Sequence, residues 1–182
     1  MRHRAARMHA VALEILMRTF YWLIEDRIAG CSRPGWDGSA SRDRPRDRSG
    51  DSLGSDLAYL REHGIGALLS LTETPLSTSA LDAVGITGCH VPIADMTAPT
   101  PEQFEQALAF IDRQVALGRR VAVHCLVGEG RTGTVLAACL IRRGHSPDAA
   151  IHALRALRSG AIASDEQQRA LRAFAARRDW IA

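Results

Sequence analysis

Residues His124–Thr134 read HCLVGEGRTGT, in which a cysteine and an arginine stand among three glycines. The compact apolar segment RRVAVHC, at 119–125, predicts a buried strand that ends at the cysteine. Thr134–Arg143 are predicted to form the next helix, and Gly144 is expected to end it. The stretch is therefore expected to be a strand-to-helix loop at the carboxyl edge of a sheet, where α/β proteins bind their ligands.

Strand and helix patterns alternate along the rest of the chain. The expected strands are YWLIED and RIAGC, which start at Tyr21 and could pair as a hairpin, then IGALLSL and ITGCHVPI. The expected helices start near Ser55, at Thr100, at Ser146-Pro147 and at Ser164. Gln103 and Gln167 each stand three residues after a capping residue, which is the capping-box pattern. This alternation predicts a single α/β domain with a central, mainly parallel sheet flanked by helices.

The ends of that domain follow from composition. Residues 1–19 carry arginines and an apolar stripe of helical spacing, so we expect a helical extension before a domain at 20–182. A targeting helix, or upstream sequence ahead of a start at Met17, are the alternatives for this segment. Residues 37–54 are rich in Gly, Ser, Asp, Arg and Pro and are expected to form a flexible surface loop.

Composition also limits the function. The chain has 182 residues and a net charge of +3, with its arginines scattered, so a nucleic-acid partner is not expected. No apolar run approaches the ~18 residues that span a bilayer. Four cysteines without a disulfide framework favour a reducing, cytoplasmic setting. Cys89-His90 and His124-Cys125 are neighbours on strands and point to opposite faces, so neither a metal site nor a cofactor is expected.

The loop itself is suited to an anion. Gly128, Gly130 and Gly133 permit backbone conformations and close approaches that a Cβ would block. Backbone N–H groups at a helix N-terminus then offer a concave site with positive partial charge. The ATP-type pattern G-x-x-x-x-G-K-[ST] is absent, so a different phosphate chemistry is expected.

Cys125 adds a nucleophile to this anion site. Thiols beside a helix N-terminus ionise more readily, and the thiolate is the reactive form. Arg131 can hold two oxygens of a phosphate while the sulfur attacks phosphorus, and the Thr132 hydroxyl can hydrogen-bond the thiolate. Cys31, Cys89 and Cys139 have no such surroundings and are interpreted as packing residues.

The pattern His124-Cys125-x-x-Gly128-x-Gly130-Arg131-Thr132-Gly133 resembles the active-site loop of cysteine-dependent protein tyrosine phosphatases. Across roughly 21–174 the chain is most similar to the compact atypical dual-specificity branch. The resemblance implies hydrolysis of phosphotyrosine, and also of phosphoserine and phosphothreonine, through a phosphocysteine intermediate. It also implies that one loop binds the phosphate. Its residues are Leu126, Val127, Gly128, Glu129, Gly130 and Arg131.

Further roles come with the resemblance. Asp95, in IADMTAPTP, matches the acid loop and would protonate the leaving group, with surface carboxylate as the plainer interpretation. His124 would orient the loop and tune the thiolate, which overlaps with the role of a buried core histidine. Gln167 matches a glutamine that positions water for hydrolysis of the phosphocysteine, although it is also the capping-box residue of its helix.

The variable loop positions bear on the substrate. Relatives that act on inositol lipids tend to be basic there, whereas Leu126, Val127 and Glu129 supply no positive charge. This favours a singly phosphorylated protein or small phosphate ester. The alternatives are a phosphatase of a small phosphorylated metabolite or inositol phosphate, a rhodanese-like sulfurtransferase, and a phospho-binding module.

Overall fold

Short segments rich in β-branched and small apolar residues form one five-stranded sheet. The computed structural model describes residues 15–16, 18–36, 38 and 49–177 of the chain. Its strands are β1 (Tyr21–Ile24), β2 (Ile28–Cys31), β3 (Ile65–Ser70), β4 (Thr87–His90) and β5 (Arg120–His124). They lie in the order β1-β2-β5-β3-β4, with β1 antiparallel to β2 and the other neighbours parallel. The predicted mainly parallel sheet and the predicted hairpin are confirmed.

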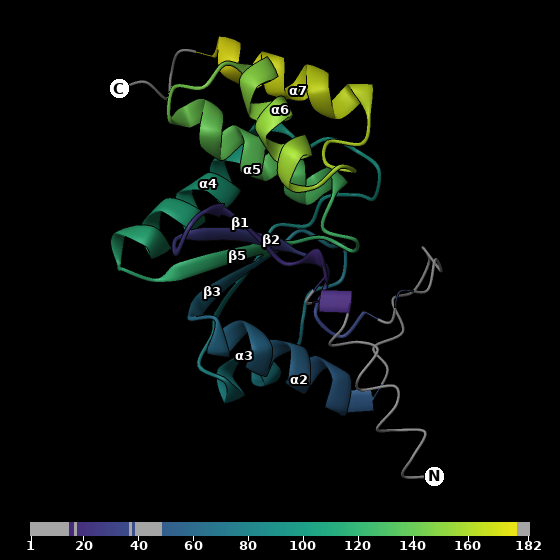
Figure 1. Ribbon diagram of the computed structural model, residues 1–182, viewed down its shortest axis with the longest axis vertical. Helices are drawn as coiled ribbons and strands as arrows, with labels where there is room; N and C mark the ends of the chain where they lie inside the picture. Colours follow the sequence, from purple (N-terminus) through teal and green to yellow (C-terminus); the bar gives the residue numbers. More distant parts are fainter. Residues whose placement is uncertain (1–14, 17, 37, 39–48, 178–182) are drawn as a thin grey trace.

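Helices lie on both sides of this sheet (Figure 1). α2 (Ser49–Glu62) and α3 (Thr78–Ala83) lie on one side, and α4 (Pro101–Ala116), α5 (Gly130–Arg142), α6 (Pro147–Leu157) and α7 (Asp165–Ala176) on the other. Successive side chains of the central strand point to opposite faces of the sheet. Val121 and Val123 pack in the core under α4 to α7, while Ala122 packs with Leu57 and Leu60 of α2. Strand β5 is therefore buried on both faces.

Three of the helix starts that the sequence predicted, those of α4, α6 and α7, are present as capping motifs. Thr100 and Gln103 form a complete capping box at α4, and Ser164 and Gln167 form one at α7. Ser146 accepts a hydrogen bond from the N–H of Ala149 at α6. These side chains satisfy N–H groups that have no partner within their helices.

Two helix starts were predicted too late. α2 begins at Ser49 rather than near Ser55, so residues 49–54 of the predicted flexible loop are helical. Glycine and serine favour loops locally, but Leu53, Leu57 and Leu60 share one helix face and pack on the sheet. Residues 37 and 39–48 of that loop lie outside the described residues.

α5 likewise begins at Gly130 and not at Thr134. Gly130 and Gly133 have weak helix propensity, which placed the predicted start beyond them. Gly133 is nevertheless required in the first turns, because a Cβ there would lie 2.9 Å from the Cβ of Ala161. The short helix α3 was not predicted at all.

The end of the predicted N-terminal extension packs against the domain. Leu16 is buried, and the Thr19 hydroxyl donates to Ser32 Oγ at 2.7 Å. Residues 1–14 and 17 lie outside the described residues, so their predicted helix is not addressed. No described helix is both long and apolar enough to cross a membrane.

Candidate active site

The loop between β5 and α5 lies at the carboxyl edge of the sheet, where the sequence placed it. Cys125 follows the last residue of β5 directly, and α5 starts five residues later. Because β5 lies between β2 and β3, its last residues are held on both sides by parallel strands. Cys125 is thus fixed at the rigid centre of the molecule, with an exposed fraction of 3%.

Gly128 shows why this loop needs glycine. Its φ is +80°, and a Cβ would lie 2.6 Å from the carbonyl carbon and oxygen of Cys31. Both the backbone angle and the contact with β2 exclude a larger residue. The loop is also anchored from outside: Tyr21 donates its hydroxyl to the Gly128 carbonyl at 3.4 Å, and the Arg33 N–H donates to the Leu126 carbonyl at 3.0 Å. The N-terminal hairpin therefore supports the phosphate loop.

Arg131 lies in the first turn of α5 and points to the acid loop. Its Nη1 donates to the Ile93 carbonyl at 2.9 Å, and its Nη2 lies 2.7 Å from Asp95 Oδ1. The guanidinium is almost fully buried, whereas about a third of the Asp95 side chain is exposed (34%). The structure thus brings the predicted clamp and the predicted acid into one ion pair.

The acid loop has an unusual backbone next to Asp95. Met96 has a φ of +63° and donates its N–H to Asp95 Oδ1 at 3.0 Å. A methionine in this left-handed region is uncommon and carries strain. Met96 is also half exposed, at 52%. Asp95 is therefore followed directly by a strained, exposed residue of the acid loop.

His124 is fully buried behind the nucleophile. Its Nδ1 lies 3.1 Å from the Cys125 carbonyl oxygen, which can only accept, so Nδ1 carries the proton. The pKa of His124 is lowered to about 3, mainly by burial and also by the positive charges of Arg33 and Arg131. The ring is therefore neutral at physiological pH and donates to the backbone of the loop.

Thr132 and Gln167 lie beside the same loop. The Thr132 hydroxyl is buried and has no hydrogen-bond partner among the described residues. Gln167 Nε2 donates to the Thr97 carbonyl at 3.0 Å, while its Oε1 accepts the Ser164 N–H at the capping box. Gln167 therefore joins the start of α7 to the acid loop, and both interpretations of this residue stay open.

Cys125, Arg131, Asp95, Met96 and Gln167 border a cavity of about 310 Å³, which His124 and Thr132 do not line. Its lining residues are Trp36, Gly38, Asp95, Met96, Cys125, Leu126, Val127, Glu129, Gly130, Arg131, Ala163 and Gln167. Of the predicted phosphate-binding residues, Gly128 alone does not line it, since it packs on β2. Sequence reasoning missed Trp36 and Ala163, because no local pattern connects them with the motif.

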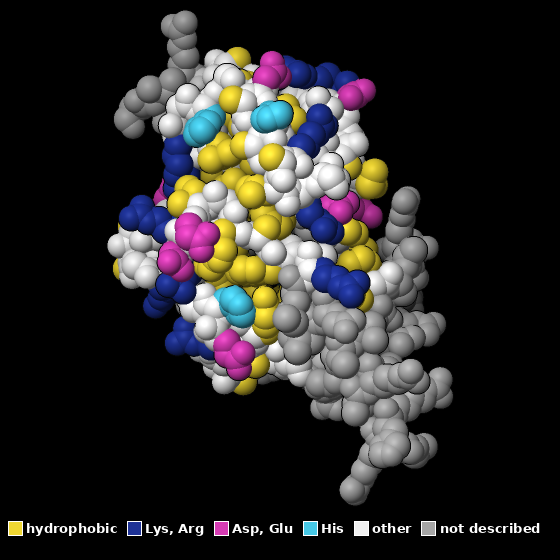
Figure 2. Space-filling view, viewed as in Figure 1, with side chains coloured by type: hydrophobic (Ala, Val, Ile, Leu, Met, Phe, Trp, Pro, Cys, Tyr) yellow, Lys and Arg dark blue, Asp and Glu magenta, His cyan; other side chains and the backbone are white. Residues whose placement is uncertain are grey.

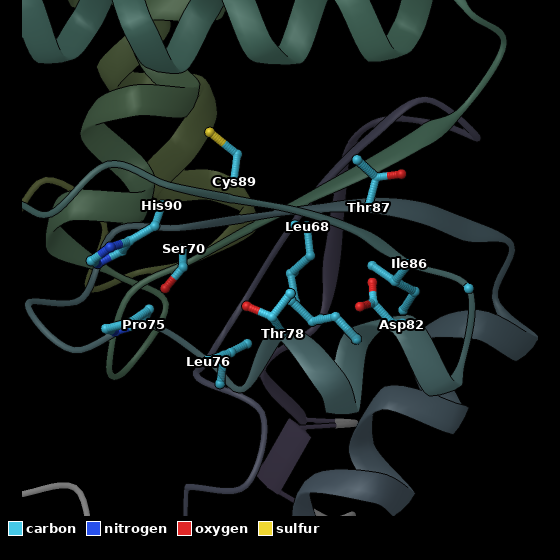
Figure 3. A pocket seen from close by; sticks show the side chains of 13 residues that line it. Leu68, Ser70, Pro75, Leu76, Thr78, Asp82, Ile86, Thr87, Cys89 and His90 are labelled. Atoms are coloured by element: carbon cyan, nitrogen blue, oxygen red, sulfur yellow. The ribbon is translucent and has the colours of Figure 1, made fainter.

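A larger cavity, of about 510 Å³, lies elsewhere, between α3 and the strands β3 and β4 (Figure 3). Leu68, Leu76 and Ile86 line it, and the Cys89 sulfur points away from them in that view. This cavity holds no counterpart of the arginine and glycine loop. The chemistry therefore belongs to the smaller cavity.

The other cysteines differ from Cys125. Cys31 and Cys139 are fully buried, and burial raises the pKa of both thiols, that of Cys139 to about 12. Such thiols stay protonated and act as packing residues. Among the residues that the structure describes, no three His, Cys, Asp or Glu side chains are grouped to hold a metal ion.

The site combines three features: a cysteine directly after a central parallel strand, a glycine-rich loop, and an arginine in the first turn of the next helix. Together they define a cysteine-dependent phosphatase. The chain belongs to the family described as "Polymorphic toxin system, DSP-PTPase phosphatase", whose family model matches residues 45–145. It is a compact, atypical member of the tyrosine and dual-specificity phosphatases, which are phosphoric monoester hydrolases.

Two relatives and one solved structure illustrate the similarity. Phosphatidylglycerophosphate phosphatase PTPMT1 of Arabidopsis thaliana is 31% identical over 123 residues, which is 64% of this chain and 36% of that protein. Human protein tyrosine phosphatase type IVA 3 is 30% identical over 117 residues, which is 63% of this chain and 68% of that protein. The crystal structure of Tk-PTP in the active form matches with a TM-score of 0.69 at 30% identity, covering 83% and 92% of the two chains.

Proposed function

We propose that this phosphatase hydrolyses phosphotyrosine in proteins, and also phosphoserine and phosphothreonine, through a phosphocysteine intermediate. The observation that carries the proposal is the meeting of Cys125, Arg131 and Asp95 in one 310 Å³ cavity. Nucleophile, phosphate clamp and proton donor are the three groups that this reaction needs.

The first step transfers the phosphoryl group. The Cys125 thiolate attacks phosphorus, the S–P bond forms as the P–O bond to the leaving group breaks, and the Asp95 carboxyl gives its proton to the leaving oxygen. Arg131 and the free N–H groups of the first turn of α5 hold the charged oxygens. Since Arg131 Nη2 lies 2.7 Å from Asp95 Oδ1, the phosphate competes with Asp95 for the guanidinium. Binding of substrate therefore releases Asp95 to act as the acid.

The second step hydrolyses the phosphocysteine and regenerates the free enzyme. Water attacks phosphorus and gives a proton to the Asp95 carboxylate, and the S–P bond breaks to yield inorganic phosphate and the thiolate. The Thr132 hydroxyl, which is buried without a partner among the described residues, is available to stabilise that thiolate. Gln167 lines the same cavity and is our candidate for positioning the water.

The cavity lining supports an aromatic substrate with one phosphate. Trp36, Met96 and Val127 offer apolar surface next to Cys125, and Arg131 is the one cationic residue among the described residues that line the cavity. On the face seen in Figure 2, arginine side chains are interspersed with acidic ones.

A small phosphorylated metabolite or an inositol phosphate is the second candidate substrate. The name of the Arabidopsis relative, a phosphatidylglycerophosphate phosphatase, supports it. Comparing kcat/KM across phosphopeptides, inositol phosphates and nucleotides separates the two candidates. A reducing, cytoplasmic setting is part of the proposal, because the nucleophile must stay a thiol, and cell fractionation tests it.

Replacement of the nucleophile tests the chemistry. For Cys125→Ser we expect turnover of a phosphotyrosine peptide to fall below detection, while the peptide still binds, because Arg131 and the loop N–H groups remain. Cys89→Ser, at the half-buried edge strand, is the matched control and should keep activity. Hydrolysis by Cys125→Ser at a near-native rate would disprove covalent cysteine catalysis.

A further inference from the structure

Glu129 is the one acidic residue within the phosphate loop itself, and it is paired. Its Oε1 lies 2.9 Å from Nη2 of Arg158, the residue that ends α6. Glu129 lines the catalytic cavity and stands immediately before the first turn of α5, yet it makes no side-chain hydrogen bond to cap that helix. The carboxylate therefore turns away from the helix N-terminus, where a carboxylate is usually stabilised, to meet an arginine from another element.

The space for this pair is provided by Gly160. A Cβ at this position would lie 2.3 Å from Glu129 Oε2 and 2.4 Å from its carboxyl carbon. A side chain at 160 would thus displace the carboxylate from Arg158. The ion pair therefore depends on Glu129 in the phosphate loop and on Arg158 and Gly160 in the segment after α6.

The segment that carries Arg158 is held in place. Arg155 donates from Nη2 to the Ile162 carbonyl at 3.1 Å and from Nε to the Ala161 carbonyl at 3.3 Å. Ile162 has a φ of +57°, a conformation that costs a β-branched residue strain. Ala163, the next residue, lines the catalytic cavity. The turn from Arg158 to Ala163 is therefore a fixed wall of the active site.

We propose that the Glu129–Arg158 pair determines the charge that the site accepts, and so selects substrates with a single phosphate. This inference rests on the proposed phosphatase function and names its specificity determinant. With the pair intact, the charges of Glu129 and Arg158 cancel, and Arg131 supplies the positive charge that binds the phosphate. Without Glu129, the Arg158 guanidinium becomes an unpaired cation next to the phosphate loop and attracts a second phosphate. Without Arg158, Glu129 becomes an unpaired anion and repels phosphate.

Single and double variants test the proposal because they predict changes of opposite sign. The substrates are a phosphotyrosine peptide and inositol 1,4-bisphosphate, compared as the ratio of their kcat/KM values. For Glu129→Gln we expect the ratio to shift about fivefold toward the bisphosphate, and for Arg158→Gln about fivefold away from it. The double variant should return the ratio to within about twofold of the native one, and high salt should reduce both shifts.

The exposed pair Arg172–Asp148, between α7 and α6, supplies matched controls. Arg172→Gln and Asp148→Asn change the net charge by the same amounts and should leave the ratio unchanged. Shifts of the same sign in both single variants, or shifts no larger than those of the controls, would overturn the proposal and leave the pair a structural contact.

A binding measurement separates this inference from the proposed function. In a Cys125→Ser background, which does not turn over substrate, the ratio of the Kd values of the two ligands is measured. Glu129→Gln should shift this ratio toward the bisphosphate, and Arg158→Gln should shift it away. If native protein hydrolyses neither substrate while these Kd ratios still split, the proposed function fails and the charge selection stands. If hydrolysis occurs and the Kd ratios do not split, the charge selection fails alone.

Discussion

The Arg131 guanidinium already makes two interactions in the cavity, and the phosphate of a substrate must compete with them. The guanidinium donates to Ile93 and pairs with Asp95, so clamp and acid are joined before any phosphate binds. The proposed reaction needs the Asp95 carboxyl to donate a proton to the leaving group, so this ion pair must break before the acid can act. The phosphate of the substrate breaks the pair by taking the guanidinium and placing negative charge near Asp95. The two residues therefore act in sequence.

Arg131→Lys tests the clamp. Lysine keeps the charge but cannot reproduce the planar fork, so we expect KM to rise and kcat to fall together, with kcat/KM lowered at least about tenfold. Steady-state kinetics on a phosphotyrosine peptide measures this. Unchanged kinetics in this variant would mean that Arg131 does not grip the phosphate with two donors.

Asp95→Ala tests the acid. Loss of proton donation should cost about 100-fold or more with a phosphotyrosine peptide, and less with an aryl phosphate whose phenol leaves without help. Native activity should be bell-shaped in pH, since Asp95 must be protonated while Cys125 is ionised, and the variant should lose the basic limb. Equal losses for all leaving groups, with that limb intact, would mean that Asp95 is not the proton donor.

At the scale of single residues, the sequence predicted the site residues that lie within one continuous motif. Cys125, Arg131 and Thr132 were predicted because their chemistry is readable from spacing and glycines alone. Trp36, Ala163 and Arg158, the partner of Glu129, were not, because chain folding brings them from distant segments. Glu129 was predicted only as a loop residue without positive charge, and its ion pair with Arg158 was not predicted.

Helix α7 connects stability with chemistry through one side chain. Gln167 closes the capping box with its Oε1, reaches Thr97 in the acid loop with its Nε2, and lines the cavity. A substitution at Gln167 therefore alters all three contacts, and a variant of the cap alone is needed to separate them.

Gln167→Ala and Ser164→Ala form that comparison. Both break the cap and should lower the free energy of unfolding by about 1 kcal/mol. If Gln167 positions water, Gln167→Ala alone should slow the second step, so kcat falls, kcat/KM is retained, and a burst of leaving group precedes steady turnover. Denaturant unfolding and rapid-mixing kinetics measure the two effects. The same kinetics in both variants would limit Gln167 to the cap.

Elements with strong local signals were predicted with accurate starts, as the capping boxes of α4 and α7 illustrate. The starts of α2 and α5 were predicted late because their first turns consist of residues with weak helix propensity. Packing of Leu53 on the sheet and of Gly133 on Ala161 decides these starts, and both contacts are tertiary. Local sequence patterns do not contain that information.

The whole molecule has two cores, one on each face of the sheet, and His124 is fully buried at the end of its central strand. Burial lowers its pKa to about 3 from an ordinary value of 6.5. Below pH 6.5 the unfolded chain therefore binds a proton at this site that the folded chain does not. The contribution of His124 to stability is complete above pH 6.5 and is lost as the pH falls toward 3.

His124→Asn should flatten this dependence on pH. Between pH 6.5 and 5 the native protein should lose about 2 kcal/mol more of its free energy of unfolding than the variant, at about 1.4 kcal/mol per pH unit. Denaturant unfolding at several pH values measures this difference. His152→Asn, at an exposed position of α6, is the control and should match the native slope. Equal slopes for the native protein and His124→Asn would contradict a neutral, buried ring.

The strand order β1-β2-β5-β3-β4 also has a consequence for synthesis on the ribosome. β2 and β3 emerge early but meet only through β5, which is the last strand to leave the exit tunnel. A nascent chain that stops before residue 120 therefore carries two separate strand pairs, each with an edge that awaits the same missing strand. Cys125 emerges directly after β5. Cys125 is therefore synthesised just after the strand that joins the β1-β2 pair to the β3-β4 pair.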